Sequence, residues 1–155
     1  MQSVILKKSA DSFIKRKHPW IFSGAIEKVE GNPSNGETVQ IFTSNKTLVG
    51  LGSYSPSSQI RVRVWSFNPE ENIDLDFFQR RISLAYSLRE KIIDTSKTNA
   101  YRIINAESDG LPGLIVDRYA DFLVCQFLSA GAEFYKKMII EVLDDIFKPF
   151  GIFER

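Results

Sequence analysis

A short basic and aromatic run carries the most specific chemistry in this 155-residue sequence. Lys15, Arg16 and Lys17 stand directly before His18, and Trp20 follows two positions later. Cationic side chains neutralise phosphates, and an indole ring is a surface on which nucleic-acid bases stack. The run therefore fits a site for a polyanion that carries aromatic bases. It fits equally well a solvated basic loop beside a buried tryptophan, and the residue types alone leave both interpretations open.

A second group of candidate residues is acidic. Glu107, Asp109 and Asp117 surround a turn that contains Gly110 and Gly113. Paired carboxylates can act as general acid and base. Aspartate in a turn also bonds its own backbone, so a structural role is the favoured interpretation and acid–base chemistry is the alternative.

Other catalytic chemistries lack the residues that they need. Cys125 lies in the apolar run 122–127, where a thiol keeps a raised pKa and packs as a small hydrophobic group. His18 is the only histidine, and no serine stands in a Gly-x-Ser-x-Gly turn, so a hydrolytic triad has no support. One cysteine and one histidine likewise disfavour a metal site. No strand-to-helix segment has the closely spaced glycines of a nucleotide-binding loop, and we expect no catalytic residue, metal or cofactor in this chain.

The charge is distributed unevenly around a net value of +1. Residues 1–65 contain nine Lys/Arg and four Asp/Glu, whereas the remainder contains eleven Lys/Arg and fifteen Asp/Glu. This asymmetry indicates two modules with different partners, the first of which suits a polyanion.

The elements that position these residues also differ between the two halves. Residues 1–68 predict a small β-barrel, with strands at 3–6, 20–26, 38–42, 47–54 and 59–65. The last of these runs alternates strictly, with Ile60, Val62 and Val64 on one face and Arg61 and Arg63 on the other.

Residues 69–73 are polar and predict a linker before a second domain at 74–155. In that domain we expect a helix at 75–93, capped by Asp74, with Phe78, Ile82, Ala85 and Ile92 on its buried face. Strands are expected at 101–105, 114–116 and 122–127, followed by a helix at 132–147 that buries Phe134, Met138, Val142 and Ile146. The expected class is α+β.

The two ends of the chain add expectations about its context. A further strand begins at Ile152–Phe153, which suggests the front part of a longer protein. The apolar N-terminal stretch is too short for a signal peptide, and no run is long enough to span a bilayer. We therefore expect a cytoplasmic protein with no membrane partner.

Three long stretches resemble a known family. Residues 17–26 and 52–63 resemble the N-terminal PUA domain of bacterial 23S ribosomal RNA cytosine-5 methyltransferases, and residues 105–119 look like that family's central α+β domain. The resemblance covers essentially the whole chain. It implies that the family pattern continues beyond Arg155 into a Rossmann-like domain that binds S-adenosylmethionine and carries the catalytic cysteine. Cys125 does not match that cysteine, so no catalytic residue is carried over and these 155 residues alone are expected to be inactive.

What the resemblance implies for mechanism is positional. The barrel would hold structured ribosomal RNA while the other domain methylates carbon 5 of an unstacked cytosine. From the residues and the resemblance together, we expect RNA contacts from Lys15, Arg16, Lys17, His18, Trp20, Tyr54, Arg61 and Arg63.

We also expect the turn after residue 105 to face the cleft between the barrel and the catalytic domain. The residues in this hypothesis are Glu107, Asp109, Gly110, Leu111 and Pro112. On this hypothesis, alanine at Glu107 and Asp109 in the longer enzyme lowers activity more than stability.

The expected partners are ribosomal RNA, the catalytic domain of the same parent chain and, through open edge strands, a second copy in a homodimer. Two other functions remain open from the sequence: a stand-alone PUA-type RNA-binding adaptor without catalysis, and a protein-interaction module in which the basic loop is incidental.

Overall fold

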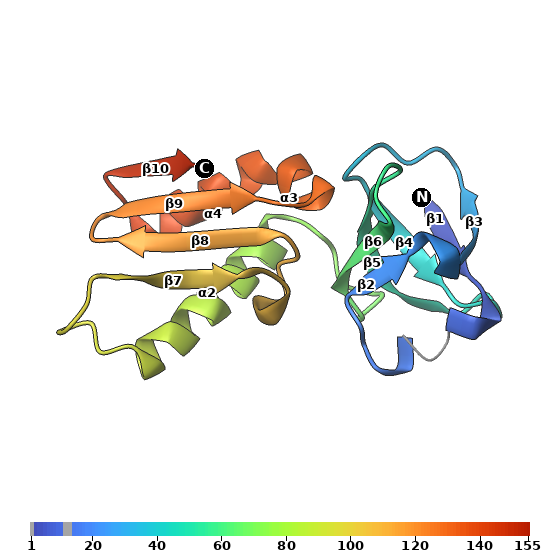
Figure 1. Ribbon diagram of the computed structural model, residues 1–155, viewed down its shortest axis with the longest axis horizontal. Coiled ribbons are helices and arrows are strands. Elements are labelled where there is room, and N and C mark those ends of the chain that lie inside the picture. The colour runs from blue at the N-terminus through green and yellow to red at the C-terminus, as the bar shows by residue number, and fades with distance from the viewer. Residues whose placement is uncertain (1, 11–13) are drawn as a thin grey trace. The chain divides into compact units, whose positions relative to one another are not determined.

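The computed structural model describes residues 2–10 and 14–155. The chain divides into two compact units, Met1–Asn72 and Ile73–Arg155, each with its own sheet (Figure 1). The two units are considered in turn.

The N-terminal unit is a six-stranded sheet with the order β2-β6-β5-β4-β1-β3. Strand β1 pairs in parallel with β4, and the other neighbours in this sheet are antiparallel. The strands of this unit are accompanied by two short 3-10 turns. The bounds of these elements are β1 Ser3–Leu6, η1 Lys8–Ala10, β2 Trp20–Phe22, η2 Ser23–Ala25, β3 Ile26–Glu30, β4 Thr38–Phe42, β5 Leu48–Tyr54 and β6 Ile60–Ser66.

The sheet curls around one apolar core (Figure 1). Alternate residues along each strand point inward because side chains on a strand change face at every step. The predicted alternation in β6 is confirmed, since Val62 and Val64 are buried and Ile60 is half-buried. The buried members of this core are Val4, Leu6, Ala10, Ile21, Val39, Ile41, Val62 and Val64.

The single strand predicted at 20–26 is wrong, because the structure divides this segment among β2, η2 and β3. Strand β2 pairs with β6, whereas β3 pairs with β1 at the other edge of the sheet. The chain must therefore cross from one edge to the other within three residues. The backbone N–H of Ser23 donates to the Gln59 carbonyl and that of Lys7 donates to the Ala25 carbonyl, both at 2.9 Å, which ties the two edges together.

The C-terminal unit is a four-stranded sheet with the order β10-β9-β8-β7, and helices α2 and α4 lie together on one of its faces (Figure 1). Strand β10 runs parallel to β9, and the remaining pairs are antiparallel. Strand β8 extends three residues further than predicted and turns into β9 through Ala120, which has a positive φ of 53°. The bounds are α2 Leu75–Ile92, β7 Ala100–Asn105, η3 Ala106–Asp109, β8 Leu114–Tyr119, β9 Phe122–Phe127, α3 Ala130–Phe134, α4 Lys136–Phe147 and β10 Gly151–Glu154.

Helix α2 begins where the capping signal predicts. The Asp74 carboxylate accepts a hydrogen bond of 2.9 Å from the backbone N–H of Phe77, which satisfies a donor of the first turn. Phe78, Ile82 and Ala85 are buried as expected. The placement of Ile92 on the buried face is wrong, because the last turn of the helix borders an open groove beside β7 and leaves this side chain exposed.

The last predicted helix is two helices, and Tyr135 is the residue at which α3 ends and α4 begins. The Tyr135 ring packs against Phe78 of α2, with ring centroids 5.2 Å apart, and its backbone leaves the helical region. Phe134 is consequently exposed, contrary to the prediction, while Val142 of α4 is buried as expected.

Cys125 of β9 belongs to the core of this unit. Its side chain is fully buried with Val116 and Leu123, which share the helix-covered face of the sheet through the β8–β9 register. Burial raises the pKa of the Cys125 thiol to about 12. The side chain therefore behaves as a small hydrophobic group, as the sequence suggested.

This burial predicts that Cys125 resists alkylation. Iodoacetamide attacks the thiolate, and a thiol whose pKa is about 12 is almost wholly protonated at pH 8. We expect mass spectrometry to find no adduct on the folded protein and complete labelling in 6 M guanidinium, taken as about the concentration that unfolds most domains. Rapid labelling of the folded protein would contradict the assignment of Cys125 to the core.

Candidate RNA-binding surface

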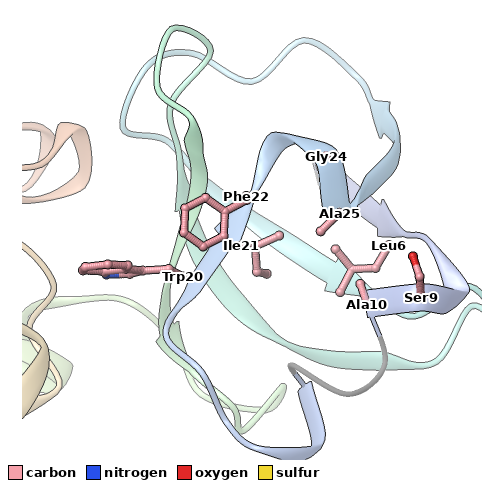
Figure 2. Close-up of a pocket in the computed structure, with 8 residues that line it drawn as sticks. All are labelled: Leu6, Ser9, Ala10, Trp20, Ile21, Phe22, Gly24 and Ala25. Carbon is pink, nitrogen blue, oxygen red and sulfur yellow. The ribbon is translucent and has the colours of Figure 1, made fainter.

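Strand β2 forms one edge of the barrel sheet and carries Trp20. Pro19 fits at the start of an edge strand because it lacks an N–H group, and its carbonyl accepts a 2.8 Å hydrogen bond from the backbone of Val64. The register pairs Trp20 with Arg63, so these two side chains lie next to each other on the outer face of the sheet. Ile21 points the opposite way, toward Leu6 in the core (Figure 2).

Three rings follow one another along this edge, and we call His18, Trp20 and Phe22 the aromatic row. The ring centroids of His18 and Trp20 are 6.0 Å apart and those of Trp20 and Phe22 are 6.5 Å apart, both edge to face. The Nδ1 atom of His18 accepts a hydrogen bond of 3.2 Å from the backbone N–H of Trp20, which fixes the imidazole at the start of the row. The strand thus presents a rigid series of rings.

Phe22 was not among the residues that we selected from the sequence. Its side chain is 43% exposed although phenylalanine is usually buried. The period of two in a strand places Phe22 on the same face as Trp20, and this signal was available in the sequence.

An apolar pocket lies behind β2, between this strand and the first 3-10 turn (Figure 2). It has a volume of about 330 Å³, and Ser9 contributes a polar side chain to its lining. The lining residues are Leu6, Ser9, Ala10, Trp20, Ile21, Phe22, Gly24 and Ala25. A concave apolar site with one hydroxyl beside exposed rings suits a flat aromatic group such as a base.

The basic run reaches this edge directly. Lys15, Arg16 and Lys17 are exposed, and Lys17 has a positive φ of 51° where the chain turns toward His18. Lys7 adds a cation beside the pocket, because its Nζ donates a hydrogen bond of 2.9 Å to the carbonyl of Gly24. Phosphates of a polyanion that lay along the aromatic row would therefore meet cations at its start and at its far side.

Two of the selected barrel residues have internal roles. Tyr54 pairs in register with Val62 and packs against the barrel core, where it is half-buried. The guanidinium of Arg61 donates a hydrogen bond to the carbonyl of Pro56 and so holds the loop between β5 and β6. The structure brings Trp20, His18 and Arg63 together on β2 and β6, and RNA contacts by any of the selected residues stay a prediction.

In the C-terminal unit, Asp109 is the centre of the turn between β7 and β8. Its two carboxylate oxygens accept hydrogen bonds of 2.8 and 2.6 Å from the guanidinium of Arg89 on α2, and one of them also accepts the Asn105 N–H at 2.6 Å. The Asp109 side chain is 4% exposed and that of Arg89 is 14% exposed. This pair joins the turn to the helix.

The other residues of this turn are also fixed by close contacts. Gly110 has a φ of +70°, which ends the 3-10 turn η3, and Gly113 has a φ of +78°. A Cβ atom at Gly113 would lie 2.4 Å from the side chain of Ser129, so only glycine fits. Leu111 is fully buried and the Pro112 carbonyl accepts a hydrogen bond of 2.9 Å from Ser129. Glu107 is half-buried, and the orientation of this turn toward a cleft stays a prediction.

Asp117 of the acidic group is also bound by an arginine. Asp117 of β8 accepts hydrogen bonds of 2.8 and 3.2 Å from Arg102 of β7, and this contact raises the pKa of the Arg102 guanidinium. Both oxygens of each carboxylate are bound by a guanidinium group, which favours the structural interpretation of Asp109 and Asp117 over acid–base catalysis. Within residues 2–10 and 14–155, no group of three or more His, Cys, Asp or Glu side chains could hold a metal ion.

Comparison with known proteins places these features in a family. Residues 4–67 match the family of PUA-like domains. Over 153 residues the chain is 50% identical to "Ribosomal RNA large subunit methyltransferase I" of Aeromonas hydrophila, and it is 49% and 46% identical to the proteins of that name from Vibrio cholerae and Aliivibrio fischeri. By sequence, the chain belongs to this methyltransferase family. The resemblance noted from residues 17–26, 52–63 and 105–119 is thereby confirmed for large-subunit ribosomal RNA methyltransferases, and the cytosine-5 specificity stays a prediction.

The chain matches only a part of each of these relatives. The alignment includes 99% of this chain, but the chain spans only 38–39% of the length of the three relatives. Among solved structures, one that is provisionally assigned as a SAM-dependent methyltransferase from Streptococcus mutans superimposes with a TM-score of 0.86 at 17% identity. That superposition includes all of this chain and 40% of the other, and it confirms the α+β fold with a PUA-like barrel. No helix in the part of the chain that the structure describes is both long and apolar enough to cross a bilayer.

The contact between Arg89 and Asp109 changes the effect that we expect from replacing Asp109. Because Asp109→Ala leaves the Arg89 guanidinium buried without its carboxylate, we expect a loss of about 3 kcal/mol in the free energy of unfolding of this unit. Urea unfolding followed by circular dichroism measures the effect. Asp145→Ala is the matched control, because the Asp145–Lys148 pair is 70% exposed on both sides and should cost less than about 0.5 kcal/mol. Equal losses in both variants would show that the Arg89–Asp109 pair contributes little.

Proposed function

We propose that this chain is the RNA-binding part of a longer S-adenosylmethionine-dependent methyltransferase that modifies large-subunit ribosomal RNA. The observation that carries the proposal is the aromatic row on the edge of a PUA-like barrel, with an apolar pocket behind it and the cations of the basic run at its start. Methyltransferase relatives at 46–50% identity favour this function over a stand-alone adaptor.

In this proposal the barrel binds the RNA and orients it. Phosphate contacts from Lys15, Arg16 and Lys17 supply most of the affinity and no sequence selectivity. Stacking of an unpaired base on Trp20 or Phe22 then favours a structured RNA with an exposed loop or bulge over a continuous duplex. A base-modifying enzyme must remove its target from the stack, so a firm hold on the flanking nucleotides lowers the cost of that step. We assign the modified atom to carbon 5 of a cytosine, in agreement with the family resemblance.

Methyl transfer belongs to a part of the parent protein outside these 155 residues. S-adenosylmethionine supplies the methyl group, and the residues present here do not fit it. The connection from β9 to α3 is the strand-to-helix segment that most resembles a cofactor-binding loop. Its polar groups, however, already bond to other residues of this unit. The Ser129 hydroxyl accepts the N–H of Ala132 at 3.1 Å and donates to the Pro112 carbonyl, and Ser129 also packs on Gly113. We place the complete enzyme in the cytoplasm, where ribosomal RNA is accessible to it.

Charge reversal of the basic run tests the electrostatic part of this proposal. The variant Lys15→Glu, Arg16→Glu, Lys17→Glu should weaken binding of a fluorescent ribosomal RNA hairpin at least about tenfold at 50 mM salt. The dependence of log Kd on log salt should also become shallower, by about 2 to 3, because fewer counterions are released. Anisotropy titrations at 50 and 200 mM salt give both values, with these concentrations taken from about the range where the effect is largest.

The control for this variant carries the same charge change in the C-terminal unit, as Lys97→Glu, Lys137→Glu, Lys148→Glu. It should bind like the unmodified protein. If both variants weaken binding equally, net charge and not the basic run governs the affinity.

Truncation of the aromatic row tests the stacking part. Phe22→Ala and Trp20→Ala should each weaken RNA binding by about 5- to 100-fold, since base stacking contributes about 1–3 kcal/mol per base, and neither should alter the salt dependence. Phe134→Ala, a change at an exposed ring on α3, is the control. Near-ultraviolet circular dichroism verifies that the barrel is folded. Unchanged affinity in Phe22→Ala and Trp20→Ala would support the solvated-loop interpretation of this segment.

A further inference from the structure

A second group of exposed rings lies in the C-terminal unit, on β8, β9 and β10 and on the residue before β10. We call Tyr119, Phe122, Phe150 and Phe153 the aromatic patch. These side chains are 53%, 41%, 81% and 58% exposed, respectively. Phe122 is the centre of the patch, with its ring centroid 6.2 Å from that of Phe150 and 5.9 Å from that of Phe153. Exposed apolar groups that are contiguous, unlike single ones, mark interaction surfaces.

The patch occupies the face of the sheet that carries no helix. Cross-strand partners share a face, and the register pairs Tyr119 with Phe122 and Val124 with Phe153. Phe122 and Val124 are two residues apart on β9, so Tyr119, Phe122 and Phe153 point to the same side, and Phe150 joins them through its ring contact with Phe122. The residues between them, Leu123 and Cys125, are buried on the opposite face, which α2 and α4 cover. This sheet therefore has one face packed under helices and an open face that carries the aromatic patch, which a further layer could cover.

The patch continues to an open edge. Strand β10 is the outermost strand of its sheet, and its residue Gly151 lies directly against the rings of Phe122 and Phe153. Edge strands with apolar side chains invite further pairing, and folded proteins cover them. The face and the edge together offer one continuous surface.

Charge decides between RNA and protein as the occupant. Residues 73–155 contain eleven Lys/Arg and thirteen Asp/Glu, so this unit is slightly acidic. Near the patch, Arg102 is bound to Asp117, Lys148 contacts Asp145 at 2.9 Å, and the guanidinium of Arg118 donates to the Ala120 carbonyl. An RNA-stacking sheet needs cations for the backbone phosphates, whereas this unit is slightly acidic and Arg102 is held by Asp117, so the surface suits an apolar protein surface.

We propose that the aromatic patch and the β10 edge are the docking surface for the part of the parent protein outside these 155 residues. This inference rests on the proposed function, in which the chain is one portion of a longer enzyme. The curated relatives are long enough to supply the missing layer, because this chain spans only 38% of the Aeromonas protein. A segment tethered to the patch is present at an effective concentration on the order of millimolar, which a second copy of the chain does not reach in solution. Docking there would fix the barrel-bearing half of the enzyme to the half that performs the chemistry.

The experiment compares Phe150→Ser, Phe153→Ser in the 155-residue chain and in the full-length parent enzyme, both followed by thermal unfolding. In the short chain the two side chains are already exposed, and we expect the midpoint to change by less than about 2 °C. In the longer enzyme the same change should lower the midpoint by about 5 °C or more, or separate one transition into two, because the docked layer is lost. Hydrogen exchange of the β10 amides should be slower in the longer enzyme than in the short chain, and this protection should disappear in the variant.

The matched control is Leu84→Ser, Phe134→Ser, which removes two exposed apolar side chains from α2 and α3. It should shift both lengths equally and leave the protection of β10 intact. Equal shifts in the short and long proteins for the patch variant would overturn the proposal. A short chain that is dimeric by analytical ultracentrifugation and becomes monomeric on Phe150→Ser, Phe153→Ser would assign the surface to a second copy instead.

A fall in RNA affinity with unchanged unfolding of the longer enzyme would assign the patch to RNA and would equally overturn the docking proposal. These readouts do not depend on the barrel. Failure of the barrel to bind RNA would remove the proposed function while the comparison of unfolding midpoints still tests the docking surface.

Discussion

The 3-10 turn Ser23–Ala25 is the constraint on which the barrel and its surface depend. It joins the two edges of a six-stranded sheet, and its hydrogen bonds to Gln59 and Lys7 hold those edges together. Because β2 is fixed at one side of this closure, Ile21 enters the core and its neighbours Trp20 and Phe22 necessarily face outward. The pocket lies behind the same strand and is lined by residues of β1, η1, β2 and η2. Rings, pocket and basic run are therefore consequences of how this barrel closes.

The two units use their charges in different ways, which explains the asymmetry of the sequence. In the barrel unit, Lys15, Arg16 and Lys17 are exposed on the segment that leads into β2. In the C-terminal unit, arginines from a helix and a strand are bound by aspartates of the β7–β8 turn and of β8. A buried ion pair contributes little net stability but strongly penalises the loss of either partner, so it fixes the geometry of the turn. The ion pairs of the second unit thus hold its turn and strands in place, whereas the aromatic patch on its surface is apolar.

Much of the fold followed from local pattern. The alternation in β6 and the Asp74 cap of α2 depend on neighbouring residues alone, and the sequence displays them directly. The errors share a different origin. The division of 20–26 depends on which distant strands pair at each edge, and the break at Tyr135 depends on a ring of α2 more than fifty residues earlier. The partner of Asp109, twenty residues away, was invisible for the same reason.

The candidate site shows this limit most clearly. Residue type selected Tyr54 and Arg61 as RNA contacts, and the structure shows in addition that the tyrosine packs against the core and that a loop carbonyl engages the arginine. The exposure of Phe22 and its ring contact with Trp20 add a residue that residue type alone did not select. An aromatic residue therefore signals binding only when its strand is known to present it outward beside cations. The same criterion separates the two aromatic surfaces of this chain, because the row on β2 adjoins the exposed cations of the basic run, whereas the aromatic patch lies in a slightly acidic unit whose Arg102 is bound to Asp117. Rings beside exposed cations suit RNA, and rings beside neutralised charge suit a protein layer.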